Sequence, residues 1–263
     1  MYNFDYVKPG SVADAVKALG EEGAQPISGG QTLIPTLKQR LNMPGSLVDL
    51  TKIPDLVGIE VTGDSVTIKG ATPHAQVAAH EGVQKAIPGL THLAGHIGDP
   101  QVRNRGTIGG SVANNDPAAC YPAAVLALGG TVITDKREIA ADDFFQGMFT
   151  TALDEGEIVT AVRFPIPEKS AYQKFVQPAS RFALTASFVA KFADGVRVAV
   201  TGASEGGVFR WTEAEAALSG DFSPAAVEQL KVSADGMIGD IHGSPEYRAN
   251  LVKVMTKRAV AAA

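Results

Sequence analysis

Two glycine pairs, far apart in the chain, constrain its fold more than any other feature. The first lies in SGGQT (residues 28–32, the first glycine motif) and the second in TIGGS (residues 107–111, the second glycine motif). Glycine has no Cβ, so backbone N–H groups can approach an anion closely, and a helix that begins after Thr32 adds its positive end. Two such turns can hold the two phosphates of a dinucleotide, but they can also be ordinary turns. Glycine spacing alone does not separate these interpretations.

Other nucleotide and catalytic motifs are missing from the sequence. No G-x-G-x-x-G follows the first expected strand, and no P-loop is present. The G-x-S-x-G and H-E-x-x-H patterns are also absent, and Cys120 lacks the context of a papain-like nucleophile. A pair of carboxylates is not excluded, but nothing points to one. We therefore predict no catalytic residue and expect a bound cofactor to supply the chemistry.

Composition narrows the class of protein. The chain has 263 residues, 45% of them hydrophobic, and a formal net charge of -5. These values predict a compact soluble protein rather than a disordered one, and the acidic excess argues against nucleic-acid binding. A single cysteine, Cys120, rules out a disulfide framework and an iron–sulfur cluster held by this chain alone. His92 and His96 are spaced as helix neighbours, but they lack acidic partners, so we predict no metal site.

The sequence also indicates where in the cell the protein is expected. The most apolar stretch, residues 118–133, is interrupted by Tyr121, Pro122 and a glycine pair, and is shorter than a membrane span requires. The first residues show neither the basic nor the apolar region of a secretion signal. We expect a cytoplasmic protein without a membrane span, and leave peripheral membrane contact open.

Hydrophobic periodicity predicts alternating helices and strands in the first 50 residues and a mixture of hairpins and helices beyond them. The expected helices cover residues 12–19, 33–41, 72–79 with Thr72 as the N-cap, 90–96, 117–128, 212–218, 224–230 and a long segment from 245; the expected strands cover 25–28, 46–50, 59–61, 66–68, 131–134, 158–164, 188–192 and 196–200. The proline-rich segment 165–169 is the expected domain boundary.

Residues 98–115 are mostly polar or glycine and include Arg103 and Arg105. We predict a long loop here that leads into the second glycine motif. Long loops in compact domains tend to be functional, although a merely solvated loop would have a similar composition.

Three segments carry a family resemblance. They are ISGGQTLIPTLKQRL (residues 27–41), IGDPQVRNRGTIGGSVANNDPAA (residues 97–119) and DIHGSPEYRANLVKVMTKRAV (residues 240–260). In this order and spacing they resemble the FAD-binding medium subunits of molybdenum hydroxylases. That family includes aerobic carbon monoxide dehydrogenase and xanthine dehydrogenase. The second segment is the most specific of the three.

The resemblance implies an α+β fold. It comprises an FAD-binding domain of the vanillyl-alcohol-oxidase (PCMH) type, built from α/β subdomains at residues 1–57 and 58–167. A smaller α+β C-terminal domain follows at residues 168–263.

The resemblance also implies the cofactor site. The first motif would cradle the pyrophosphate, the second would contact the other phosphate and the ribityl chain, and Ile97 would lie near the isoalloxazine ring. Asp116 would contact the adenosine side or the ribityl chain, and Lys174 would lie on the cofactor side. The full set of implied FAD-binding residues is Ser28, Gly29, Gly30, Gln31, Thr32, Leu33, Ile97, Thr107, Gly109, Gly110, Ser111, Asn114, Asp116 and Lys174.

One residue departs from the family pattern. Many relatives carry Asp where this chain has Cys120, so a carboxylate contact with the cofactor is either missing or supplied by Asn114, Asn115 or Asp116. Helix packing is the simpler explanation for the thiol, and we do not interpret it as a covalent flavin link.

By this resemblance the chain is an electron-transfer subunit of an oxidoreductase, most like the medium chain of carbon monoxide dehydrogenase. Electrons would pass from [2Fe-2S] clusters on a small partner subunit through FAD to an external acceptor. A large partner subunit would hold the molybdopterin-bound molybdenum, in a dimer of heterotrimers. The alternatives are a stand-alone flavin-dependent oxidase or reductase of the same fold and, less in keeping with the motifs, a nucleotide-binding regulatory module.

Overall fold

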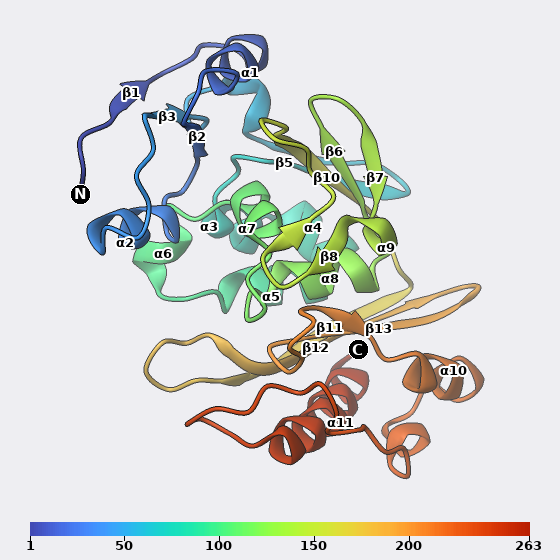
Figure 1. Cartoon of the computed structure of the whole chain (residues 1–263). Helices are drawn as coiled ribbons and strands as arrows, with labels where there is room; N and C mark the ends of the chain where they lie inside the picture. The colour runs from blue at the N-terminus through green and yellow to red at the C-terminus, as the bar shows by residue number, and fades with distance from the viewer.

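A computed structural model describes all residues, 1–263. It runs from a small N-terminal sheet, through a central layer of short helices, to a C-terminal sheet with its own helices (Figure 1). The N-terminal sheet is parallel, with strand order β1-β3-β2. Its elements are β1 (Asp5–Val7), α1 (Val12–Leu19), β2 (Ala24–Ile27), α2 (Leu33–Lys38) and β3 (Ser46–Asp49).

The second part is built on an antiparallel sheet with strand order β4-β5-β10-β6-β7. Its elements are η1 (Pro54–Leu56), β4 (Ile59–Val61), β5 (Ser65–Lys69), α3 (His74–Ala79), α4 (Glu81–Ala86), α5 (Pro88–Gly95), α6 (Pro100–Arg103), α7 (Ile108–Asn114), α8 (Tyr121–Ala127), β6 (Thr131–Thr134), β7 (Glu138–Ala140), α9 (Ala141–Phe144), β8 (Phe145–Gly147), β9 (Thr150–Thr151) and β10 (Val159–Pro165).

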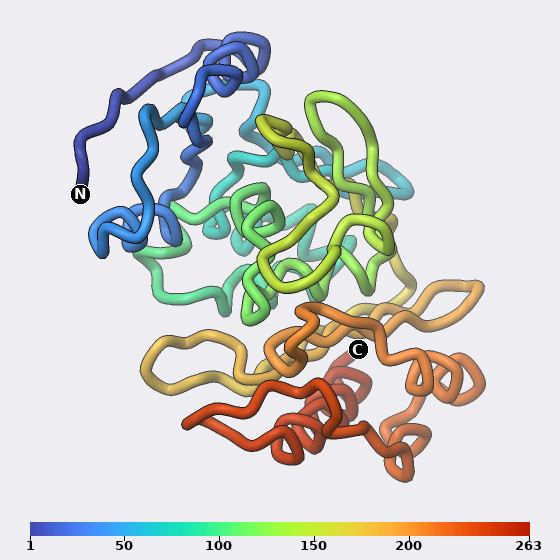
Figure 2. Tube along the Cα trace, viewed as in Figure 1, coloured from blue at the N-terminus to red at the C-terminus, as the bar shows by residue number.

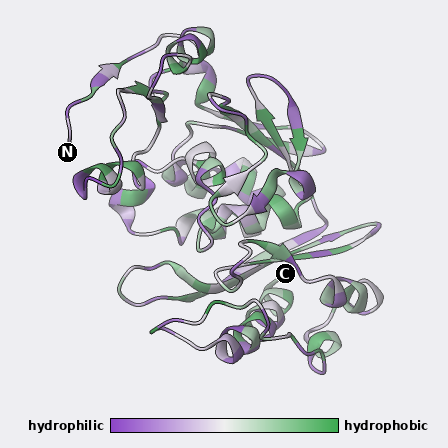
Figure 3. Cartoon of the chain, in the orientation of Figure 1, coloured by the Kyte–Doolittle hydropathy of each residue, from purple (hydrophilic) through white to green (hydrophobic).

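The third part is an antiparallel sheet with strand order β11-β12-β13-β14. Helices α10 and α11 pack on it, and α5 and α8 of the second part also contact it. Figure 3 shows both colours along α11, as expected for a helix with one buried and one exposed side. The elements are β11 (Lys169–Val176), β12 (Ala183–Phe192), β13 (Gly195–Thr201), β14 (Phe209–Arg210), α10 (Thr212–Gly220), η2 (Pro224–Val227) and α11 (Pro245–Ala262).

The mixture of helices and sheets is the α+β fold that the resemblance implied. Each of the three larger sheets takes its strands from one of the predicted segments 1–57, 58–167 and 168–263. The largest buried cluster nevertheless runs from Val66 to Ala199 and joins the second and third segments in one core. We keep the division into three as a proposal.

Four local predictions were wrong. The helix expected over residues 224–230 is only a 3₁₀ turn, η2 (Pro224–Val227). Helix α2 ends at Lys38 rather than at residue 41, because Arg40 takes a positive φ of 59° and leaves Leu41 exposed. Residues 98–115 are not one loop, since they contain α6 and α7. Thr72 does not cap α3. Its hydroxyl instead donates to the carbonyl of Gly58 and accepts the N–H of Gly58.

No helix combines the length and apolar character needed to cross a membrane.

Candidate FAD site

A cavity of about 620 Å³ lies where the three parts of the chain meet, within the range of about 300–1,000 Å³ common for cofactor pockets. All fourteen residues that the resemblance implied line it, although they come from segments scattered between residues 28 and 174. The structure therefore gathers the whole expected set around one space.

The two glycine motifs meet at this cavity. The hydroxyls of Ser28 and Thr107, 79 residues apart in sequence, lie 2.9 Å from each other in a hydrogen bond. Gly29 allows this approach, because a Cβ there would lie 2.2 Å from the carbonyl oxygen of Arg105. Gly109 likewise allows a close contact with Gly70, the residue after β5, because a Cβ on Gly109 would lie 2.6 Å from the carbonyl oxygen of Gly70. Both glycines are required by backbone contacts within the protein.

The first glycine motif leaves its backbone donors free. None of the six N–H groups from Ser28 to Leu33 has a hydrogen-bond acceptor in the protein, while the next, that of Ile34, donates to the oxygen of Gly30 at 3.0 Å. Gly30 has a φ of 69°, a conformation that glycine adopts without strain. Successive unpaired N–H groups that line a concave surface bind anions such as phosphate. This segment has the donors that a pyrophosphate requires.

The second glycine motif uses its donors inside the fold. Thr107 is the N-cap of α7, so the glycine pair lies in the first turn of a helix and not in a turn between elements. The N–H groups of Ile108, Gly109 and Gly110 donate to Thr72 O, Gly70 O and Thr107 Oγ1 at 3.3, 2.8 and 3.3 Å. Gly110 is packed less tightly than Gly29 and Gly109. A Cβ added to it would meet Thr107 Oγ1 at 3.1 Å, and the next atom would be 3.9 Å away. Its open side faces the cavity that it lines.

Lys174 closes one end of the cavity. Its Nζ donates to the carbonyl oxygens of His96 at 2.5 Å and Arg181 at 3.0 Å, and lies 3.6 Å from Cys120 Sγ. These contacts fasten the hairpin between β11 and β12 to the segment that follows α5, and Figure 2 shows the gold hairpin directly below the green segment. Cys120 is 5% exposed and also lines the cavity. The thiol thus both packs at the start of α8 and faces the site.

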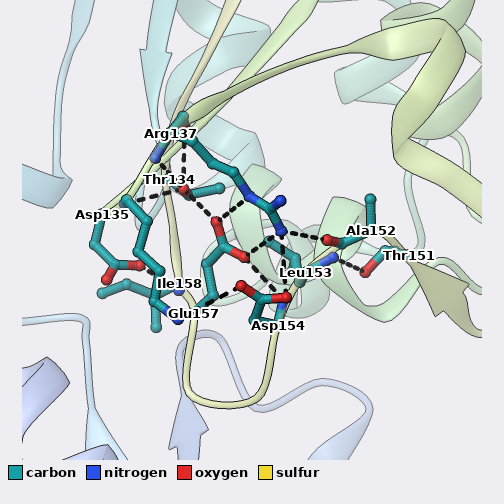
Figure 4. A network of polar contacts seen from close by, with 10 residues as sticks. Thr134, Asp135, Arg137, Thr151, Ala152, Leu153, Asp154, Glu157 and Ile158 are labelled. Atoms are coloured by element: carbon teal, nitrogen blue, oxygen red, sulfur yellow. Dashed lines mark hydrogen bonds and ion pairs between the residues drawn. The ribbon is translucent and has the colours of Figure 1, made fainter.

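A buried carboxylate supports another wall of the cavity (Figure 4). The side chain of Glu157 has no exposed surface and accepts hydrogen bonds from Arg137 Nε and Nη2, Thr134 Oγ1 and the N–H of Asp154, at 2.6–3.1 Å. Burial alone would raise the pKa of Glu157, but these hydrogen bonds and the charge of Arg137 outweigh it and lower the pKa to about 2. The ion pair fixes the turn that carries Glu157, Ile158 and Val159 to the cavity.

Sequence reasoning missed several cavity residues. His74, Gly70 and residues 157–159 line the space, but none stands beside a glycine motif in the sequence. His74 follows the Thr72-Pro73 pair, which has the sequence pattern of a helix start and carries no signal of a binding site. His92 and His96, the helix neighbours without acidic partners, have tilted rings whose centroids lie 4.2 Å apart, and His96 Nδ1 lies 2.7 Å from the carbonyl oxygen of His92. No three His, Cys, Asp or Glu side chains are grouped to hold a metal ion.

Comparison with known proteins places the chain in a family. Residues 2–167 match the family model described as the FAD binding domain in molybdopterin dehydrogenase. The chain belongs to the FAD-binding medium subunits of molybdenum hydroxylases. It accordingly binds FAD and is a subunit of a multi-subunit oxidoreductase.

Individual relatives match over nearly their whole length. The nicotine 6-hydroxylase medium subunit of Paenarthrobacter nicotinovorans is 36% identical over 97% of this chain and 95% of that protein. The glyceraldehyde dehydrogenase medium chain of Sulfolobus acidocaldarius is 34% identical over 97% and 96%. Among solved structures, carbon monoxide dehydrogenase from Hydrogenophaga pseudoflava, in a form that lacks the Mo-pyranopterin moiety of its cofactor, superposes with a TM-score of 0.90 at 33% identity, over 100% of this chain and 97% of that one.

Proposed function

We propose that this chain is an electron-transfer subunit. In this proposal it passes electrons from the [2Fe-2S] clusters of a small partner subunit through FAD to an external acceptor, while a large partner subunit holds molybdopterin-bound molybdenum and oxidises the substrate. The observation that carries the proposal is the pair of glycine motifs joined at one cavity, with six unpaired N–H groups on residues that line a space of cofactor size. When bound, FAD supplies a centre that accepts and donates both single electrons and electron pairs.

The residues of the cavity fit a holding role. The N–H groups from Ser28 to Leu33 would bind the pyrophosphate. At the second motif the backbone donors are used, so the hydroxyls of Thr107 and Ser111 and the bare Cα of Gly110 would make the contacts to the other phosphate and the ribityl chain. Asn114, the last residue of α7, and Asp116, just beyond its end, also line the cavity.

At the closed end, Ile97 would lie near the isoalloxazine ring, with Lys174 beside it. An ammonium held by three protein acceptors would supply a fixed positive charge on this side of the cofactor, and such a charge would favour the reduced, more negative flavin. No residue in the cavity is assigned as an acid or base for substrate oxidation.

The choice of substrate belongs to the partner in this proposal. The three relatives above are named for nicotine, glyceraldehyde and carbon monoxide, yet their identities to this chain lie between 33% and 36%. This near-equality gives no preference to the carbon monoxide dehydrogenase branch. The single cysteine agrees with clusters held elsewhere. We propose a cytoplasmic dimer of heterotrimers as the working assembly.

The test is purification of the tagged chain from its native host, followed by visible spectroscopy and by chromatography of the flavin released on denaturation. The proposal expects FAD together with iron and molybdenum on two co-purifying chains, and flavin bands that bleach when the substrate of the complex is added. FAD without any co-purifying iron, together with turnover of a small alcohol or aldehyde by the isolated chain, would contradict it and support the stand-alone oxidase.

A further inference from the structure

His74 is a buried histidine without a hydrogen-bond partner for its ring. It is the first residue of α3, is 4% exposed and lines the cavity. Its Nδ1 is shielded from water and unpaired in the protein. Its Nε2 faces Gly106 so closely that a Cβ there would lie 2.7 Å away. Neither nitrogen accepts or donates a hydrogen bond within the chain.

The position of this ring is set by its surroundings. The backbone N–H of His74 donates to the carbonyl of Gly106 at 2.9 Å, immediately before the second glycine motif. The ring of Tyr121 lies 5.3 Å away, centroid to centroid, and limits movement on that side. Buried polar groups without partners are rare because each costs about 1–3 kcal/mol. Because Nδ1 has no accessible surface, Nε2 is the nitrogen that a ligand in the cavity can reach.

The charge state of the ring indicates the kind of partner. Burial and, to a smaller extent, the positive charge of Arg103 lower the pKa of His74 to about 4. At neutral pH the imidazole therefore has one N–H donor and one free lone pair. An uncharged donor–acceptor suits a hydroxyl group better than a phosphate, which the unpaired N–H groups of the first motif serve.

We propose that His74 is a cofactor-binding residue whose imidazole hydrogen-bonds a ribityl hydroxyl of FAD. This inference rests on the placement of FAD in the cavity, which is part of the proposed function. It assigns the ribityl chain to the part of the cavity that His74 lines.

The experiment measures the dissociation constant of FAD for the full chain by quenching of flavin fluorescence. We compare His74→Phe, which keeps the ring shape without nitrogen, with His74→Asn and His74→Gln, whose amides occupy the positions of Nδ1 and Nε2. His74→Phe should weaken FAD binding about tenfold, the loss of one hydrogen bond. One of the two amide variants should recover most of that loss and so identify the nitrogen that binds. Equal affinity of all three variants and the parent chain would overturn the inference.

Two controls separate this result from general damage. His80→Phe removes a histidine at the other end of α3, whose Nδ1 accepts the N–H of Val83 at 3.2 Å, and should leave FAD affinity unchanged. ADP, which lacks the ribityl chain, should bind the His74→Phe chain as it binds the parent. An equal loss of ADP affinity in His74→Phe would overturn the ribityl assignment. If the parent chain bound ADP but not FAD, the proposed function itself would fail, a result distinct from any behaviour of the His74 variants.

Discussion

The two glycine motifs look alike in the sequence, but the structure uses them differently. The five N–H groups of the first motif, and that of Leu33 after it, are unpaired in residues that line the cavity, whereas N–H groups of the second donate to Thr72, Gly70 and its own N-cap. Within each motif one glycine serves a backbone contact, Gly29 against Arg105 and Gly109 against Gly70. A glycine pair thus indicates that the backbone at that point makes a close contact. Only the surrounding hydrogen bonds show whether that is a ligand or another part of the chain.

The largest expected effect comes from the packed glycines. Gly29→Ala and Gly109→Ala each place a Cβ within 2.6 Å of a backbone oxygen. Because backbone cannot move aside as a flexible side chain can, we expect each to lower the free energy of unfolding by more than about 3 kcal/mol. Urea denaturation of the FAD-free chain measures this. Stability unchanged in both variants would show that the contacts between the motifs and the backbone behind them are not close.

The second prediction uses pH to distinguish the motifs, since the first contains no titratable side chain and the second rests against His74. The pKa of His74 is about 4 in the folded chain, where Arg103 and Tyr121 face it, and about 6.5 when unfolded. The unfolded chain binds the proton first, so stability is full above pH 6.5 and falls as the pH drops toward 4, by up to about 3 kcal/mol.

The comparison is between the parent chain and His74→Gln in urea unfolding at pH 7.5, 6, 5 and 4.5. The parent should lose more stability on acidification than the variant. Parallel curves would mean that His74 is not held neutral by burial.

Gly110→Val should separate binding from folding. An added Cβ there would meet only side-chain atoms of Thr107 and Ser28, so stability should change by less than about 1 kcal/mol. FAD affinity should fall roughly 100-fold, because Gly110 lines the cavity and the cofactor could no longer approach the motif. Flavin content after purification and the thermal midpoint are the two readouts. A full flavin complement in this variant would refute the role given to the second motif.

The smallest expected effect concerns the bond between the motifs. Ser28→Ala, Thr107→Val and the double variant form a double-mutant cycle, and we expect a coupling of about 1 kcal/mol in the free energy of unfolding for this partly buried hydrogen bond. Thr36→Ala serves as a control, because its hydroxyl donates to Thr32 O on the exposed side of α2 and should not couple to Thr107. Coupling near zero would indicate that the motifs are held together by backbone packing alone.

Much of the site was predictable because its residues form contiguous motifs. Thirteen of the fourteen predicted residues lie in segments recognised by order and spacing, and the fourteenth, Lys174, was implied by the resemblance alone. The α+β fold followed from the same resemblance. Residues from elsewhere, such as His74 and Glu157, were missed because each stands alone in its segment and reaches the cavity only through the fold.

Errors of local structure arose where long-range contacts outweigh local preference. Thr72 has the side chain of an N-cap, but Gly58, 14 residues earlier, takes both its donor and its acceptor. Residues 98–115 are polar enough for a loop, yet Asp99 and Thr107 cap two short helices there.

By itself the sequence determined the chemical parts of this protein: glycines that admit close backbone approach, hydroxyls beside them, and a single cysteine that leaves iron–sulfur clusters to other chains. Only the tertiary structure decided how those parts are used. Whether an N–H is free for phosphate or paired within the fold depends on which backbone lies opposite, and that neighbour comes from a distant part of the chain. The difference between the two motifs is therefore a property of their partners, Gly70 and Thr72 in one case and the open cavity in the other.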